Sequence, residues 1–208
     1  MDSGPDPTAV ERALATYYDQ EAGDRAGRAL DPKRVAARTE FLQLLDGRRP
    51  RLLEVGTGPG RDLAAFVAAG LPVTGIDLSI EHAARAADVG AGTAVASARA
   101  LPFHDKAFDA LWTMSTLMHV PNSAIEATLA ELGRVLTSGA LAVIGVWGGP
   151  DVEDHHDHDA YQPPRLFSRR SDDRWQSLLG ILGSVEQFET WDRSDQAFWY
   201  QWAVVRAS

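Results

Sequence analysis

The 208-residue chain is 45% hydrophobic and 24% charged and contains no cysteine, which excludes collagen, coiled coil, wholesale disorder, disulfides and thiolate chemistry. Its formal charge of −9 disfavours nucleic acid as a partner and suits a neutral or cationic small molecule better. No apolar run approaches a membrane span and no signal-peptide pattern opens the chain, so we expect one cytoplasmic domain with no membrane partner.

The first 50 residues predict two helices. Asp6 and Asp31 are each followed by proline, which is the pattern of an N-cap residue with proline at the first helical position. We expect the first helix to run to about Ala22 and the second to end near Gly47.

From residue 51 onward, short apolar strands alternate with helices. Strands are predicted at 51–55, 73–77, 93–96, 107–112 and 140–147. Helices are predicted at 62–69, from Ser79 to about Val89, and after Ser123, which has capping-box spacing to Glu126. Nearly continuous apolar strands are typical of a parallel sheet that is buried on both faces.

The alternation ends after Trp147. We expect a loop over 148–170, a helix from Ser171, and strands at about 184–191 and 197–206 that pair antiparallel across the turn 192–196. The predicted fold class is therefore α/β: a doubly wound, Rossmann-like sheet of about seven strands, mostly parallel with an antiparallel C-terminal strand, with helices on both faces.

A glycine-rich loop, Glu54-Val55-Gly56-Thr57-Gly58-Pro59-Gly60, joins the first strand to its helix. Its glycines permit a tight turn and close approach of a ligand, and the helix N-terminus supplies free N–H groups. Asp77 ends the next strand, where its carboxylate can accept from both hydroxyls of a ribose. The dinucleotide pattern G-x-G-x-x-G does not fit, because Arg61 and Leu63 stand where its third glycine would fall.

The pattern E-x-G-x-G-x-G instead resembles the class I S-adenosylmethionine-dependent methyltransferases, of the small-molecule type. The resemblance runs from about Leu52 to Trp147 and includes the segments 98–103, 117–121 and 131–139. It implies S-adenosylmethionine as cofactor and direct in-line methyl transfer to an O-, N- or C-nucleophile of a small-molecule acceptor, by analogy in secondary metabolism. Residues 1–50 would be lid elements, 51–208 the methyltransferase domain, and 148–170 an insertion near the acceptor site.

The resemblance also implies a set of cofactor-binding residues. Asp77 would hold the ribose, Leu78 would pack on adenine, and Met114 would lie near the methionyl portion. The implied positions are Glu54, Gly56, Thr57, Gly58, Gly60, Asp77, Leu78, Ser97, Ala98, Arg99, Met114, Ser115 and Tyr18. Ser97 departs from the family pattern, which often has an aspartate there, so its hydroxyl would bond the adenine amino group without charge.

His119 is the candidate catalytic base, because it follows the fourth strand and an ordinary histidine pKa of about 6.5 suits proton removal. The alternative is that it only lines the cleft. Tyr17 and Tyr18 resemble residues of a lid helix, with core packing as the alternative, and Arg28 is a weaker lid candidate.

Two further groups of residues have ordinary explanations. His155, His156 and His158 lie among Asp154, Asp157 and Asp159 and could ligate a metal, but a solvated acidic loop without metal is the expectation. One or two of the C-terminal tryptophans 175, 191, 199 and 202 could wall an aromatic acceptor pocket. The rival functions are an NAD(P)-dependent oxidoreductase and a non-catalytic S-adenosylmethionine-binding module, and the oligomeric state is left open.

Overall fold

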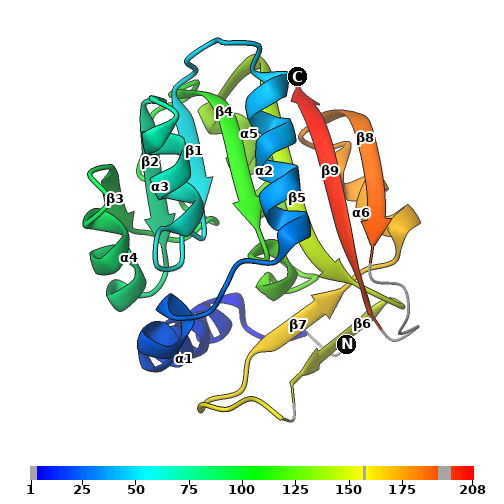
Figure 1. The fold of residues 1–208 in the computed structure, drawn as a ribbon. Helices are drawn as coiled ribbons and strands as arrows, with labels where there is room; N and C mark the ends of the chain where they lie inside the picture. The colour runs from blue at the N-terminus through cyan, green and yellow to red at the C-terminus, as the bar shows by residue number, and fades with distance from the viewer. Residues whose placement is uncertain (1–3, 157, 192–197) are drawn as a thin grey trace.

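The computed structural model describes residues 4–156, 158–191 and 198–208. Within these residues a seven-stranded sheet has the order β3-β2-β1-β4-β5-β9-β8 (Figure 1). Its strands are β1 Leu52–Val55, β2 Val73–Asp77, β3 Gly92–Val95, β4 Phe108–Met114, β5 Leu136–Gly148, β8 Gly183–Trp191 and β9 Trp199–Ala207. The strands from β3 to β5 pair in parallel and β9 is antiparallel to both its neighbours, so the predicted fold class is confirmed.

Helices cover both faces of the sheet, as Figure 1 shows. They are α1 Pro7–Ala26, α2 Pro32–Leu44, α3 Arg61–Ala68, α4 Ile80–Ala87, the short 3-10 helix η1 Leu117–His119, α5 Ile125–Val135 and α6 Asp172–Leu179. Successive residues of a strand point to opposite faces. Leu52 therefore packs into the core with α2 and α3, whereas Leu53 packs into the core with α5 and α6.

The helix N-termini follow the predicted caps in three of four cases. The carboxylates of Asp6 and Asp31 accept hydrogen bonds from backbone amides two residues further on, at 3.0 and 2.7 Å. Ser79 accepts from the amide of His82 at 3.0 Å. The capping box predicted at Ser123 is wrong, because a backbone turn carries the chain one residue further and the N-cap of α5 is Ala124, with no side-chain bond.

The segment 148–170 was predicted as a loop, and the structure corrects this. It forms an antiparallel hairpin of β6, Val152–His155, and β7, Leu166–Arg169. Polar contacts hold the hairpin: Arg169 pairs with Asp154 at 2.5 Å, and Glu153 accepts from the hydroxyl of Ser168 at 2.6 Å. A hairpin held by charges has no apolar pattern to signal it. The predicted turn 192–196 lies outside the described residues.

The helix α1 and the β6–β7 hairpin both lie beyond the carboxyl ends of the parallel strands (Figure 1). The strand order changes direction between β1 and β4. Ligands of doubly wound sheets bind at such a switch point, beyond the carboxyl ends of the strands. The fold thus brings α1, the hairpin and the glycine loop to one edge of the sheet.

A buried carboxylate connects α2 to the sheet beneath this edge. Asp62, in the first turn of α3, is 1% exposed. It accepts from Arg34 Nε at 2.7 Å, Arg38 Nη1 at 2.8 Å and Trp112 Nε1 at 3.0 Å. Both oxygens are therefore compensated, and removing the carboxylate would leave two guanidinium groups facing a low-dielectric interior.

We expect Asp62→Ala to lower the free energy of unfolding by about 3–5 kcal/mol, as for other broken buried ion pairs. Urea denaturation would measure it. The matched control is Asp109→Ala, because Asp109 pairs with Arg51 at 2.8 Å on the exposed surface and should cost much less. Equal losses in the two variants would contradict the compensating role of Asp62.

Candidate functional site

The glycine loop between β1 and α3 needs its glycines for steric reasons. Gly56 has φ 76°, and a Cβ there would lie 2.0 Å from Thr116 Oγ1. Gly60 has φ 83°, and its Cβ would lie 2.9 Å from the Cα of Ala86, so this glycine lets α3 approach α4. Both backbones are in the left-handed region that favours glycine. Gly56 therefore shapes the loop, and Gly60 acts by packing.

Asp77 holds this loop from the end of β2. Its carboxylate accepts from the amide of Gly58 at 2.8 Å and from the amide of Ser79 at 2.9 Å. His82 Nδ1 lies 3.7 Å from Oδ1. A carboxylate has about four acceptor positions, so two backbone bonds leave capacity for hydroxyl groups of a ligand.

Glu54 lies beneath the loop and is 1% exposed. Neither of its carboxyl oxygens has a hydrogen-bond partner among the described residues. Burial, and then the neighbouring charge of Asp62, raise the pKa of Glu54 well above its usual range. An unsatisfied buried carboxyl group is costly, and an approaching cation would favour its charged form.

A cavity opens above the loop, at the predicted switch point. Arg34, His82 and Thr116 are further residues of its wall that the sequence reasoning did not single out. Of the predicted residues, the cavity is lined by Tyr18, Gly56, Thr57, Gly58, Asp77, Leu78, Ala98, Arg99, Met114, Ser115 and His119. Glu54, Gly60 and Ser97 are not among its lining residues.

The hydroxyl of Ser97 already has partners. It donates to the carboxylate of Glu11 and accepts from the amide of Arg99 at 2.9 Å. Arg99 also pairs with Glu11, at 3.1 Å. The Ser97 hydroxyl is therefore engaged by a carboxylate from α1, and its contact with adenine stays a prediction.

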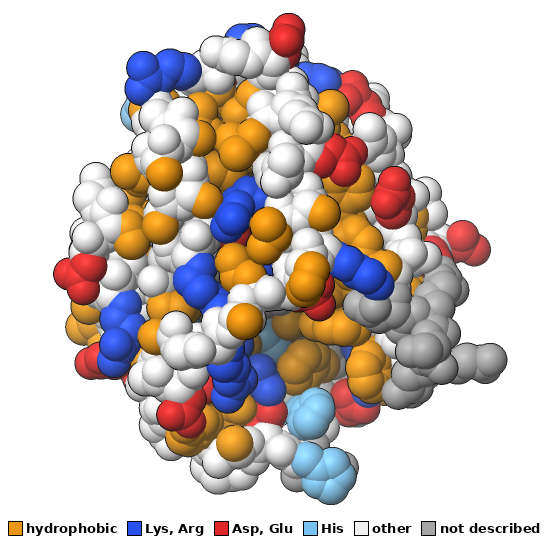
Figure 2. Space-filling model, in the orientation of Figure 1, with side chains coloured by type: hydrophobic (Ala, Val, Ile, Leu, Met, Phe, Trp, Pro, Cys, Tyr) orange, Lys and Arg blue, Asp and Glu red, His pale blue; other side chains and the backbone are white. Residues whose placement is uncertain are grey.

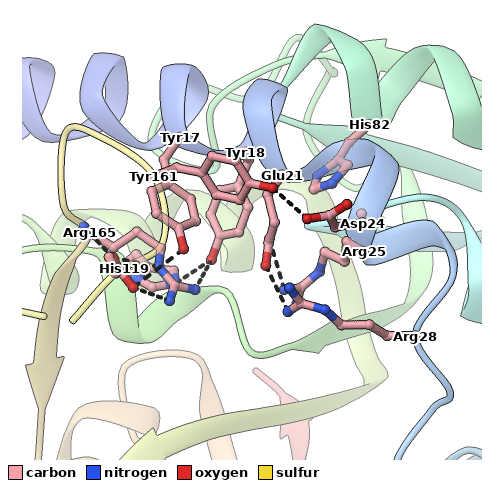
Figure 3. Close-up of polar contacts among 12 residues, drawn as sticks. Tyr17, Tyr18, Glu21, Asp24, Arg25, Arg28, His82, His119, Tyr161 and Arg165 are labelled. Carbon is pink, nitrogen blue, oxygen red and sulfur yellow. Dashed lines mark hydrogen bonds and ion pairs between the residues drawn. The ribbon is translucent and has the colours of Figure 1, made fainter.

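A chain of hydrogen bonds joins α1, η1 and the hairpin (Figure 3). His119 Nδ1 lies 2.8 Å from the carbonyl oxygen of Leu166, which can only accept, so Nδ1 carries the proton. His119 Nε2 then accepts from the hydroxyl of Tyr18 at 2.7 Å. Arg165 donates to the same hydroxyl at 3.4 Å and forms an ion pair with Asp159 at 2.5 Å.

This network changes the expectation for His119. Burial lowers the pKa of His119 to about 3, well below the ordinary value of about 6.5 on which the prediction of a base relied. Its Nε2 is occupied by Tyr18. His119 thus lines the cavity as a neutral ring hydrogen-bonded to Tyr18, and its role as base stays a prediction.

The lid candidates on α1 have different surroundings. Tyr18 lines the cavity, whereas Tyr17 is 3% exposed and packs under the guanidinium of Arg165 at 4.4 Å. Arg28 pairs with Glu21 and is not among the lining residues. Arg25, which pairs with Glu21 at 3.2 Å, does line the cavity. The i, i+4 spacing of Glu21 and Arg25 was the available signal for this pair.

Ser115 stands at the end of β4 with φ 58°, in the left-handed region that serine seldom adopts. Its hydroxyl lies 3.1 Å from Tyr200 Oη. Ser115, Tyr18 and Arg25 line both this cavity and a second one beside the hairpin. Residues with strained backbone conformations cluster at functional sites, and Ser115 lies where the two cavities adjoin.

The histidines of the hairpin line the second cavity. His155, His156 and His158 are all exposed there. Among the described residues no group of three potential metal ligands comes together, and Asp157 lies outside them. Trp147 lines this cavity, whereas Trp175 and Trp202 are buried in the core and Trp191 stacks on Tyr200.

No helix in the described part of the chain has both the length and the apolar character that a membrane span needs.

Comparisons with known proteins agree with this geometry. Residues 53–144 match the family model described as a methyltransferase domain. An uncharacterized methyltransferase of Mycobacterium marinum is 39% identical over 152 residues, which are 70% of this chain and 54% of the relative. A 2-methyl-6-phytyl-1,4-hydroquinone methyltransferase of Synechocystis is 38% identical over 108 residues, 48% of this chain and 33% of that protein. The chain thus spans about half the length of the first curated relatives.

Solved structures show the same fold. The 1,6-didemethyltoxoflavin-N1-methyltransferase of Burkholderia thailandensis, with 1,6-didemethyltoxoflavin and S-adenosylhomocysteine bound, has a TM-score of 0.78 at 20% identity and covers 98% of this chain and 91% of its own. The geranyl diphosphate C-methyltransferase of Streptomyces coelicolor A3(2) has a TM-score of 0.75 at 17% identity and covers 98% of this chain and 100% of its own.

The buried neutral state of His119 predicts a pH dependence of stability. Its pKa is about 3 in the fold and about 6.5 in the unfolded chain. Between these values the unfolded state binds more protons, so the contribution is complete above pH of about 6.5 and is lost as pH falls towards 3.

We expect His119→Asn to remove up to about 1.4 kcal/mol per pH unit from the slope of stability against pH in this window. Urea denaturation from neutral pH down to about pH 5 would measure the difference from the unmodified protein. His104→Asn is the control, since His104 is exposed. An unchanged slope in His119→Asn would show that His119 is not held neutral by burial.

Proposed function

We propose that the chain, whose residues 53–144 match the methyltransferase domain model, transfers a methyl group from S-adenosylmethionine to a small-molecule acceptor by direct in-line displacement. The observation that carries the proposal is the cavity that brings the glycine loop, Asp77 and the end of β4 together. As part of the same proposal, the enzyme acts in secondary metabolism and is located in the cytoplasm. The acceptor and the atom that is methylated are the finer questions.

The residues at the site fit the cofactor. Asp77 keeps acceptor capacity beside the loop for two ribose hydroxyls. Glu54 has two buried oxygens without partners among the described residues, which suits a cationic ammonium group that it reaches through a backbone N–H or water, since Glu54 does not line the cavity. Leu78, Ala96 and Ala98 give an apolar wall for a flat base. Glu54, rather than the loop alone, is what makes the site suited to a positively charged ligand.

When bound, S-adenosylmethionine would supply an electrophilic methyl carbon: the acceptor's electron pair would form the new bond to it, and the electron pair of the broken carbon–sulfur bond would stay on sulfur. The protein's task is to position the acceptor and to exclude water. Met114 and Ser115, at the end of β4, line the cofactor cavity, and Ser115 also lines the second cavity, so in this proposal they bound the region where transfer takes place.

We infer that the Tyr18–His119 pair orients this region. Tyr18 spans from α1 to η1, and its hydroxyl is held by His119 Nε2 at 2.7 Å. Burial raises the pKa of Tyr18, so the hydroxyl stays a donor at neutral pH. A direct role of His119 as base would require Tyr18 to move aside first. Residues 1–50 act as lid elements in this proposal, and 148–170 borders the acceptor in the domain 51–208.

The rival functions differ in what they bind and convert. A nicotinamide-dependent oxidoreductase lacks support here, because both the glycine spacing and the family match point elsewhere. A non-catalytic binding module shares the cofactor site but not turnover. The partner in this proposal is a small molecule, with no nucleic acid.

We expect Asp77→Asn to weaken S-adenosylhomocysteine binding by about 10- to 100-fold, because charge-assisted hydrogen bonds to the ribose become neutral ones. Isothermal titration calorimetry would measure the dissociation constant. Asp109→Asn is the matched control, since Asp109 accepts from Arg51 and lies outside the cavity. Equal affinity in Asp77→Asn and the unmodified protein would refute the ribose assignment.

We also expect transfer of a labelled methyl group to at least one member of a panel of phenols, amines and carboxylates, with one S-adenosylhomocysteine formed per methyl transferred. Scintillation counting of the extracted product and mass spectrometry would measure both. Binding of S-adenosylhomocysteine without transfer to any member would favour the binding module, and no binding even at millimolar concentration would overturn the proposal.

A further inference from the structure

The second cavity, beside the β6–β7 hairpin, adjoins the cofactor cavity. Tyr18, Arg25 and Ser115 belong to both walls. Figure 2 shows this face hollowed between apolar and basic side chains, with histidines at the lower rim. A molecule in the second cavity would therefore lie against the side of the site where methyl transfer is proposed.

Aromatic rings form the apolar wall of this cavity. Trp147 lies edge-to-face with Phe198, at 5.7 Å between ring centroids. Phe167 stands between His119, at 4.6 Å, and His156, at 5.6 Å. Trp147, Phe198, Phe167 and His156 line the cavity, whereas His119 does not. Rings at several angles around one hollow suit a flat, aromatic ligand better than a flexible chain.

The polar wall is basic although the chain as a whole is acidic. Three arginines, Arg25, Arg165 and Arg169, line the cavity, and Asp154 is the acid in its wall among the described residues. Arg165 is paired with Asp159 at 2.5 Å. Its guanidinium also lies 5.2 Å above the ring of Phe167, so its position is fixed by packing.

The other two arginines have unused capacity. Arg25 shares the carboxylate of Glu21 with Arg28, at 3.2 and 2.9 Å, so one negative charge faces two positive ones. Arg169 pairs with Asp154 through Nη2, but its Nε is buried without a hydrogen-bond partner among the described residues. A buried donor without an acceptor is unfavourable. The Arg169 side chain lines the cavity and is 22% exposed, so an oxygen of a ligand can compete with Asp154 for its guanidinium.

We infer that the second cavity takes a small aromatic molecule that carries an oxyanion, such as a carboxylate, with the anion at Arg169 and the ring between Trp147 and Phe167. The identification of this molecule as the methyl acceptor rests on the proposed function. The inference reverses the expectation of a neutral or cationic acceptor that the net charge suggested, because three arginines and one acid, Asp154, line this cavity among the described residues, whereas Asp159, the partner of Arg165, does not line it.

Two fluorescent probes test the inference without turnover. Anilinonaphthalenesulfonate and N-phenylnaphthylamine share an aromatic body, and only the first carries an anionic group. We expect the unmodified protein to bind the sulfonate about tenfold more tightly, as one charge-assisted contact would give. Phe167→Ala should weaken both probes, which places them in this cavity.

The matched variants are Arg169→Gln and Asp154→Asn. Both break the same ion pair of the hairpin, but only the first removes the guanidinium. We expect Arg169→Gln to weaken sulfonate binding about tenfold with little effect on the uncharged probe. Asp154→Asn should keep or strengthen sulfonate binding, because it removes the competing carboxylate. A purely structural role of the pair would change both variants alike.

The result that overturns the inference is equal affinity for the two probes, or an equal loss in the two variants. Titration of the same proteins with S-adenosylhomocysteine separates this from the proposed function. Intact S-adenosylhomocysteine binding with no preference for the sulfonate would refute the acceptor class alone. A preference that depends on Arg169, without S-adenosylhomocysteine binding, would keep the ligand class of the cavity and refute its role as methyl acceptor.

Discussion

Buried carboxylates at the carboxyl edge of the parallel sheet are the constraint on which the site depends. Asp62 is compensated by two arginines and a tryptophan, which draws α2 against α3 and β4. Asp77 is compensated by backbone amides of Gly58 and Ser79, which sets the conformation of the glycine loop. Glu54 alone lacks a partner among the described residues. A buried charge needs a compensating partner, and of these three acids the one without a partner lies beneath the proposed cofactor site.

The second organising feature is the contact of α1 with the hairpin across the edge of the sheet (Figure 3). Tyr18 is shared by His119 and Arg165, and Arg165 is shared by Tyr18 and Asp159. Each bond orients the next, so Tyr18 and His119 of the cofactor cavity and Arg165 of the second cavity belong to one hydrogen-bonded network. This explains why a histidine placed where a base is expected is instead neutral and buried. Its surroundings, not its residue type, determine its protonation.

The fold was predictable because its signals are local. Apolar strands, glycine spacing and aspartate–proline caps act over a few residues, and they predicted the sheet and the starts of α1 and α2 correctly. The β6–β7 hairpin was missed, since it is held by Arg169 and Asp154, which are 15 positions apart. Arg25 was missed as a wall residue for a related reason: its pairing partner lies on its own helix, but the cavity it lines belongs to other elements.

The sequence by itself determined the order of elements, the glycine loop and the acid at the end of β2, because steric limits and apolar periodicity are written in neighbouring residues. Only the tertiary structure decided the charge state of His119, the engagement of Ser97 by Glu11 and the basic character of the second cavity. These depend on burial and on partners from distant segments. A net charge of −9 does not indicate where the positively charged residues lie. Folding brings three arginines to the wall of the second cavity.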